Sequence, residues 1–211
     1  MIDKVVRDKA YGQEEQLSFL DCFGVYLSIR KIRKEIKRMT KNNRVVVGGQ
    51  LLDLGAGYNM TICSRFLTSF SQVTAVDVSL NENIYPTIFK IQDSLENALP
   101  RLPESNYNII FLNSVLEHIT EPLFILRECH RLLTTDGKLF INVPTWRGKY
   151  FLELSAFKLK REHAIYEMND HKMYYDQRDL WPLLVKAGFL PENIHLVYHK
   201  FGLNLFGICK K

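Results

Sequence analysis

Two glycines separated by one residue, Gly55 and Gly57, follow an apolar run that ends in the acid Asp53. Glycine lacks a Cβ, so its backbone can take a positive φ and lie directly against a ligand. A helical pattern over 60–70 follows, which predicts a buried strand at 50–54 that turns sharply into a helix. The N-terminus of that helix would face the ligand. The spacing therefore predicts a nucleotide-binding turn.

A second acid, Asp77, ends the apolar run Val73–Asp77, twenty-two positions after Gly55. In doubly wound folds, an acid at the tip of the second strand accepts hydrogen bonds from both ribose hydroxyls, because a carboxylate has paired acceptors for a vicinal diol. We therefore predict that Asp77 binds ribose and that Val78 lies at the same site. A surface acid that merely ends a strand is the alternative.

Two histidines are candidates for a general base, which an enzyme that acts on an alcohol would use to take the proton of the hydroxyl group. His118 follows the dense apolar strand expected at 107–112, and His171 lies in a segment rich in aromatic residues. A helix-capping or packed histidine is the structural alternative for each. Tyr174 and Tyr175 are expected to line an acceptor pocket, although core aromatics would give the same pattern.

The glycine spacing also separates classes of nucleotide ligand. A dinucleotide fingerprint would need glycine at Met60, so NAD and FAD are disfavoured. Asp53, Gly55 and Gly57 resemble the first motif, Asp/Glu-x-Gly-x-Gly-x-Gly, of the class I S-adenosylmethionine-dependent methyltransferases, with Asn59 in place of the third glycine. Asparagine tolerates the left-handed region, so we expect the turn to be retained. An ordinary glycine-rich turn is the alternative.

The resemblance implies S-adenosyl-L-methionine as cofactor and a Rossmann-like α/β fold. That fold has a mostly parallel seven-stranded sheet, an antiparallel last strand and helices on both faces. The resemblance also gives adenine-binding roles to Asp93 or Ser94 and to Leu95, which follow a third strand expected around 87–91. Asp93 could equally be the N-cap of a helix that runs to Leu99. The predicted cofactor-binding residues are Asp53, Gly55, Ala56, Gly57, Asp77, Val78, Asp93, Ser94, Leu95 and Asn113.

A longer block, from Leu116-Glu117-His118 to Val143-Pro144, resembles the small-molecule methyltransferases of quinone biosynthesis and glycan clusters. In the quinone O-methyltransferases, a carboxylate three residues before the Glu-His pair helps to bind a divalent cation. Ser114 occupies that position here, so we predict no metal site. The resemblance implies methyl transfer to an oxygen or carbon of a small molecule, with a sugar or nucleotide-sugar as one candidate.

The composition is that of one globular domain, with 211 residues of which 46% are hydrophobic. No stretch approaches the eighteen apolar residues of a membrane span, and the start of the chain does not read as a signal peptide. The four cysteines are scattered, which suggests neither a zinc site nor a disulfide framework. We therefore expect a cytoplasmic protein.

Four parts are expected within this domain: a helical extension (1–47), a cofactor-binding core (48–145), a lid or substrate insertion (146–175), and a C-terminal helix and hairpin (176–211). The extension should hold one amphipathic helix over 13–39 with a basic outer face. A solvated face would explain these charges. Attraction to an anionic partner, such as a nucleotide-sugar, a glycan or a lipid headgroup, is the alternative.

Other functional classes fit less well. Asn113-Ser114-Val115-Leu116 replaces the Asp/Asn-Pro-Pro-Tyr/Phe motif of nucleic-acid amino-methyltransferases, so no nucleic acid partner is expected. A nicotinamide-dependent reductase or epimerase would need a Tyr-x-x-x-Lys pair, whereas Arg178 follows Tyr174 at that interval. A non-catalytic relative that regulates a partner is the remaining alternative, although the intact glycine turn and Asp77 favour retained cofactor binding.

Overall fold

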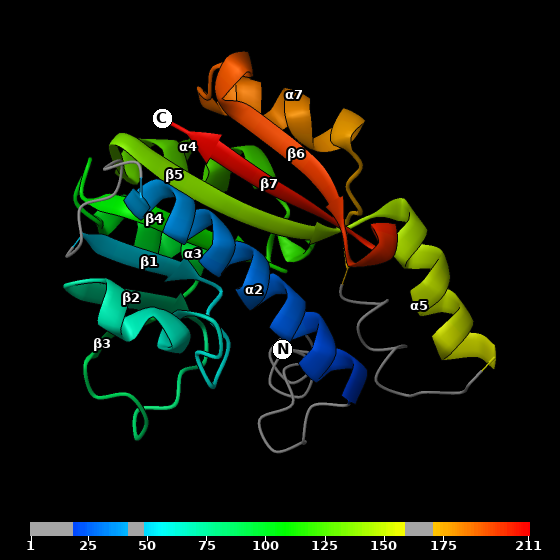
Figure 1. Ribbon diagram of the computed structural model, residues 1–211, viewed down its shortest axis with the longest axis horizontal. Helices are drawn as coiled ribbons and strands as arrows, with labels where there is room; N and C mark the ends of the chain where they lie inside the picture. Colours follow the sequence, from blue (N-terminus) through cyan, green and yellow to red (C-terminus); the bar gives the residue numbers. More distant parts are fainter. Residues whose placement is uncertain (1–18, 42–48, 159–170) are drawn as a thin grey trace.

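A seven-stranded sheet in the order β3-β2-β1-β4-β5-β7-β6 runs through the molecule (Figure 1). The structure, a computed structural model, describes residues 19–41, 49–158 and 171–211. The strands are β1 (Gln50–Leu54), β2 (Gln72–Asp77), β3 (Ile88–Gln92), β4 (Tyr107–Asn113), β5 (Leu133–Pro144), β6 (Ile194–His199) and β7 (Asn204–Lys210). Strands β1 to β5 pair in parallel, and β7 is antiparallel to both β5 and β6. The predicted fold class is confirmed.

Alternate residues of the central strands point into two separate hydrophobic cores, as the period-two geometry of a strand requires. Leu51, Ile109 and Phe111 belong to the core that α2 (Phe19–Lys41) covers on one face. Leu52 and Ile110 belong to the core on the other face. That face is covered by α3 (Leu95–Ala98), α4 (Pro122–Leu132) and α7 (Gln177–Ala187). Each fully buried aliphatic side chain contributes roughly 1.5–3 kcal/mol.

Helix α2 is amphipathic, as the spacing predicted, and crosses the front of the sheet in Figure 1. Its inward residues Ser28, Ile32 and Met39 are at most 4% exposed. The exposed side carries basic residues, which are Arg30, Arg33, Lys34, Lys37 and Arg38. Residues 1–18 and 42–47 of the expected extension, and residue 48 of the expected core, lie outside the described part of the chain. No described helix is long and apolar enough to cross a membrane.

The helix expected over 60–70 is wrong as an α-helix. Turns follow the glycines, and a 3₁₀-helix, η1 (Cys63–Ser69), takes its place. Met60 has a left-handed backbone, with a φ of 48°, whereas we had expected Asn59 to take that conformation. The Asp53 carboxylate accepts a hydrogen bond from the backbone N–H of Cys63 at 3.2 Å. The start of η1 is thus tied down to β1, instead of turning toward a ligand.

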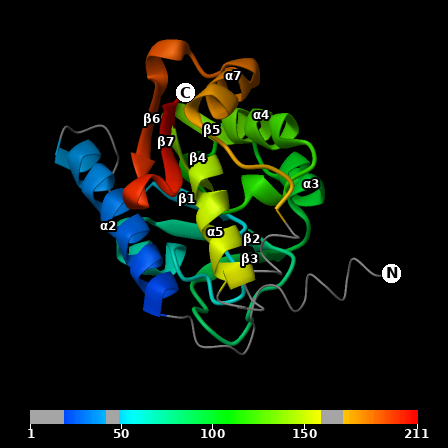
Figure 2. The ribbon, with the colours of Figure 1, turned by 90° about the vertical axis from the view of Figure 1, so that its right-hand side faces the viewer.

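Helix α5 (Trp146–Lys158) begins directly after β5 ends at Pro144, so it lies at the same edge of the sheet as the glycine turn. Figure 2 shows it in front of the sheet, with α2 to its side. Its side chains Tyr150 and Phe151 are 70% and 54% exposed. It opens the segment in which we predicted a lid, of which 159–170 lies outside the described residues.

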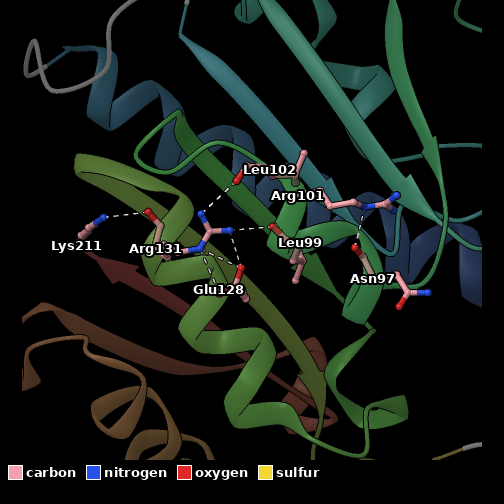
Figure 3. A network of polar contacts seen from close by, with 7 residues as sticks. All are labelled: Asn97, Leu99, Arg101, Leu102, Glu128, Arg131 and Lys211. Carbon is pink, nitrogen blue, oxygen red and sulfur yellow. Dashed lines mark hydrogen bonds and ion pairs between the residues drawn. The ribbon is translucent and has the colours of Figure 1, made fainter.

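The Arg131 guanidinium ties α4 to the turn that follows α3 (Figure 3). It donates to the carbonyls of Leu99 at 2.9 Å and Leu102 at 3.2 Å, and it pairs with Glu128 at 2.6 Å. The Lys211 ammonium donates to the Arg131 carbonyl at 3.2 Å. These contacts satisfy carbonyls that end the short helices. They therefore fasten the turn at Leu99–Leu102, which follows α3, to α4.

Candidate functional site

A cleft opens at the carboxyl ends of β1, β2 and β4, where ligands bind in open α/β sheets. Its volume is about 140 Å³. It is lined by Gly55, Asp77, Val78, Asp93, Ser94, Leu95, Glu96, Ser114, Val115, His118, Ile119, Thr120 and Lys172. Six of the residues predicted to bind the cofactor thus border one space, together with one of the two histidines.

The glycine turn has the backbone that its composition predicted. Gly55 and Gly57 have φ values of 65° and 71°, which side chains with a Cβ rarely adopt. A Cβ on Gly55 would lie 2.3 Å from a methyl group of Val115, whereas a Cβ on Gly57 would meet nothing within 4 Å. The peptide at Gly57 therefore faces open space that a ligand can fill, and this fits the adenosyl compound that we predicted.

Asp77 holds the glycine turn through its side chain. Its carboxylate accepts hydrogen bonds from the backbone N–H of Gly57 at 2.8 Å and of Ser79 at 3.1 Å. Burial raises the pKa of Asp77, and these hydrogen bonds oppose that shift. A carboxylate has about four acceptor positions, so both oxygens can still accept a hydroxyl. The geometry is thus compatible with a vicinal diol at this carboxylate.

Asp53 lies beneath the turn and not on the surface of the cleft. It is 2% exposed, and its carboxylate accepts a hydrogen bond from the backbone N–H of Cys63. Burial raises the pKa of Asp53 to about 7, while the hydrogen bonds from Cys63 act in the opposite direction. Ala56, Gly57 and Asn113 are likewise not among the residues that line the cleft. In this structure Asp53 supports the turn from below.

The loop after β3 brings Asp93, Ser94 and Leu95 to the cleft together. Ser94, and not Asp93, is the N-cap of α3, because its hydroxyl accepts the backbone N–H of Asn97 at 3.3 Å. Asp93 pairs with Arg101 and also accepts the backbone N–H of Ser94 at 2.8 Å. Hydrogen bonds from Asn97 and then Ser94 lower the pKa of Asp93, so it stays ionised beside the cleft.

The two candidate histidines lie side by side, with ring centroids 4.9 Å apart. Nδ1 of His171 and the hydroxyl of Tyr174 are 3.1 Å apart and share a hydrogen bond. The donor atoms of His118, His171 and Glu117 all lie within 4.8 Å of one another. This cluster therefore joins the loop after β4 to the segment that precedes α7.

Tyr175 does not line the cleft. It is 1% exposed, and its hydroxyl donates to the carbonyl of Leu116 at 3.3 Å. Tyr174 is also buried, at 5% exposed, and lies against Trp146 with ring centroids 5.7 Å apart. Neither tyrosine lines the cleft in this structure, because Tyr175 packs in the hydrophobic core and the Tyr174 hydroxyl shares a hydrogen bond with His171.

Some cleft residues escaped the sequence analysis. The loop after β4 contributes Ser114, Val115, Ile119 and Thr120, which its position at a strand end could have suggested. Lys172 comes from a distant segment, and its ammonium donates to the Thr120 hydroxyl at 2.8 Å across 52 positions of sequence. No pattern in the local sequence could have predicted a contact between residues so far apart in the chain.

Two asparagines at the ends of β4 and β5 are register partners, Asn113 and Asn142. Among the described residues, Oδ1 of Asn113 and both amide atoms of Asn142 are buried without a hydrogen-bond partner. Buried polar groups in native proteins are nearly always paired. These amides therefore mark a place beside the cleft where a ligand or water is expected.

A second, wider groove of about 600 Å³ lies between α7 and β6, toward the opposite edge of the sheet. It is lined by Gln177, Arg178, Trp181, Pro182, Ile194, His195 and Leu196. It includes neither a glycine turn nor an acid at a strand tip. The smaller cleft is thus the better candidate, because it gathers the residues whose chemistry fits a ligand.

Solved structures share this fold. The plantazolicin methyltransferase BpumL, in complex with S-adenosylhomocysteine, matches with a TM-score of 0.69 and 13% identity, over 100% of this chain and 90% of its own. A SAM-dependent methyltransferase from Archaeoglobus fulgidus matches with a TM-score of 0.62 and 13% identity, over 92% and 100%. At these identities the likeness shows the fold. The predicted cofactor, S-adenosyl-L-methionine, agrees with these comparisons.

Curated relatives are distant. The type II restriction enzyme BsuRI of Bacillus subtilis is 26% identical over 184 residues, which are 81% of this chain and 31% of that protein. An arginine–tRNA ligase of Baumannia cicadellinicola is 25% identical over 155 residues, or 73% of this chain and 25% of that protein. The chain thus spans a third or less of either relative. Their names denote different activities, so they indicate no common substrate.

The family comparison is the more informative one. A model of the methyltransferase domain matches residues 26–194, which include most of α2, the glycine turn, the cleft and α7. This range covers most of the chain, and the strand order and the cleft agree with it. The chain therefore belongs to the methyltransferase domain family.

Proposed function

We propose that this enzyme transfers a methyl group from S-adenosyl-L-methionine to an oxygen or carbon of a small molecule. One observation supports the proposal: a single cleft is lined by Gly55 of the glycine turn, by Asp77 and by His118. An adenosyl ligand and an acceptor placed in it would be neighbours. Positioning of two reactants contributes much of the rate in such a transfer.

Different residues of the cleft would bind different parts of the cofactor. Asp77 would accept the ribose hydroxyls, and the loop from Asp93 to Leu95 would hold the adenine. The open peptide face at Gly57 leaves room for the amino-acid part. When bound, the cofactor supplies an electrophilic methyl group. The chain's own task is then to orient the acceptor and to exclude water from it.

His118 is the residue of the cleft beside which an acceptor hydroxyl would lose its proton. Its imidazole lines the cleft, and His171 packs against it. The segment 146–175 would form the acceptor side of the site. The exposed basic residues of α2 support an anionic acceptor, such as a sugar phosphate or nucleotide-sugar. The free, buried Cys63, Cys129 and Cys209 are in keeping with a reducing, cytoplasmic location.

Calorimetry tests the proposal directly. Titration with S-adenosylhomocysteine should show one site per chain, and titration with NAD should show none. Asp77→Ala serves as the site variant, and His195→Gln serves as a control on exposed β6. Binding of NAD alone would overturn the proposal, and binding of neither compound would favour a non-catalytic relative. Methyl transfer from labelled cofactor to a panel of hydroxylated anionic small molecules would then identify the acceptor.

A further inference from the structure

Three metal-ligating side chains meet beside the cleft. One carboxylate oxygen of Glu117 and one nitrogen each of His118 and His171 lie within 4.8 Å of one another. Three ligands bound about 2.1 Å from one ion lie roughly 3–3.5 Å apart, so only small side-chain adjustments separate this cluster from coordination geometry. Ser114 lacks the carboxylate that helps to bind a divalent cation at this position in the quinone O-methyltransferases. His171 offers a third ligand from a distant segment instead.

The cluster is held rigidly by its surroundings. The Glu117 carbonyl accepts the backbone N–H groups of Lys172 at 2.7 Å and Met173 at 3.3 Å. The Tyr175 N–H donates to the Pro144 carbonyl at 2.9 Å. The segment that carries His171 is thus fastened to the loop that carries the other two ligands. Such prior ordering reduces the entropy that ion binding would otherwise cost.

His171 also has the partner that a metal-bound histidine normally keeps. Its Nδ1 shares a hydrogen bond with the Tyr174 hydroxyl at 3.1 Å. In metal-bound histidines, a hydrogen bond to the ring nitrogen that does not bind the ion fixes the tautomer and the ring orientation. Glu117 is 1% exposed, and a carboxylate taken so far from water is stabilised by a cation beside it. An ion held by all three groups would supply that charge.

We propose that Glu117, His118 and His171 form a binding site for a divalent transition-metal ion of the zinc class. Two imidazoles and one carboxylate suit Zn²⁺, Co²⁺ or Mn²⁺ better than Mg²⁺, which prefers oxygen ligands and water. Three protein ligands leave at least one coordination position open. Because His118 lines the cleft, the ion would be held beside the space in which the acceptor would lie.

This inference rests on the proposed function for its chemical meaning. An acceptor hydroxyl that binds the ion has a lowered pKa, so its O–H bond ionises near neutral pH and the proton passes to solvent. The oxygen stays on the ion as a nucleophile, and nothing is oxidised or reduced. The histidines then act as ligands and not as free bases. The acceptor class is a small molecule with a hydroxyl, or two adjacent hydroxyls, that can chelate a cation.

Cobalt titration tests the site without any acceptor. The full-length chain is stripped with a chelator and titrated with Co²⁺, whose visible absorption reports ligand number and type, and metal content is measured after dialysis. Wild type should bind one Co²⁺ per chain. His171→Gln should weaken binding at least tenfold, and Tyr174→Phe should weaken it severalfold by releasing the ring. His195→Gln, on the exposed surface of β6, is the matched control and should change nothing.

Affinity for S-adenosylhomocysteine is measured on the same samples. It should stay within about twofold in His171→Gln, which also shows that the variant is folded. Equal Co²⁺ binding by wild type and His171→Gln would overturn the metal site. An equal loss of Co²⁺ affinity in His195→Gln would also overturn the metal site, because it would mean that Co²⁺ binds to exposed histidines at the surface. Metal binding without S-adenosylhomocysteine binding would leave the site standing and remove the proposed function instead.

Discussion

The carboxylate of Asp77, at the tip of β2, accepts a hydrogen bond of 2.8 Å from the backbone N–H of Gly57, in the turn that follows β1. The residue predicted to bind ribose therefore also shapes the peptide predicted to cradle the rest of the ligand. A second hydrogen bond, from Ser79, fixes the other carboxylate oxygen at 3.1 Å. The acid is thus oriented before any ligand arrives.

Asp77→Ala should weaken affinity for S-adenosylhomocysteine by about 1–3 kcal/mol, since charge-assisted hydrogen bonds to the ribose and the anchor of the turn are lost together. Asp77→Asn keeps one acceptor oxygen, so its affinity for S-adenosylhomocysteine should lie between that of wild type and that of Asp77→Ala. Because burial raises the pKa of Asp77, wild-type affinity should rise with pH as this carboxylate ionises. Calorimetry at several pH values measures both effects. Unchanged affinity in Asp77→Ala would remove the residue from the site.

Asp53 should make stability depend on pH. Its pKa is about 7 in the folded chain, against roughly 3.9 for an unfolded aspartate. The folded state therefore holds the proton more tightly than the unfolded state. The resulting contribution to the free energy of unfolding is complete below about pH 4 and is lost as the pH rises to about 7. The asparagine of Asp53→Asn cannot ionise. As the pH rises from 5 to 8, the free energy of unfolding of this variant should therefore increase by roughly 2–3 kcal/mol relative to that of wild type. Urea unfolding at four pH values tests this, and a difference that stays constant with pH would contradict it.

Asn142→Val should separate stability from binding. The variant removes a buried amide that has no partner within the described chain, so the free energy of unfolding should rise by about 1 kcal/mol. The same change should reduce affinity for S-adenosylhomocysteine or for the acceptor, because the amide is no longer there to pair with the ligand. Urea unfolding and calorimetry measure the two effects. Stabilisation with undiminished binding and activity would show that the amide serves no ligand.

Arg131→Met should lower the free energy of unfolding by about 1–3 kcal/mol, because the carbonyls of Leu99 and Leu102 lose their charged donor. Methionine keeps most of the aliphatic stem, so packing is largely preserved. Arg101→Met is the matched control, since that side chain is 63% exposed, and it should not change stability measurably. Chemical denaturation compares the two variants. Equal losses in both would argue against a special role for Arg131.

Much of the fold could be predicted from local sequence. The strands at 50–54, 73–77 and 107–112 agree with the structure to within a residue, because continuous apolar runs are typical of buried parallel strands. The helix after 176 was also found, since Asp176 and Asp179 form a capping box and Gly188 ends it with a φ of 112°. Such signals depend on neighbours along the chain.

The errors arose where distant groups decide the backbone. The expected helix at 60–70 failed because the Asp53 carboxylate holds the N–H of Cys63 and because Met60 is left-handed. Spacing alone predicted the glycine turn and Asp77, which share one cleft border. It could not show that His171 would meet Glu117, since the fold brings those segments together through contacts far apart in sequence.

Strand β7 follows both β5 and β6 in the chain, yet these two strands pair with it and not with each other. Until residues 204–210 have been synthesised, the edge of β5 therefore stays open and β6 has no partner strand, because β7 pairs with both. Exposed edges recruit other chains. Chaperone capture and aggregation during translation should thus concentrate before residues 204–210 emerge, whatever the stability of the folded domain.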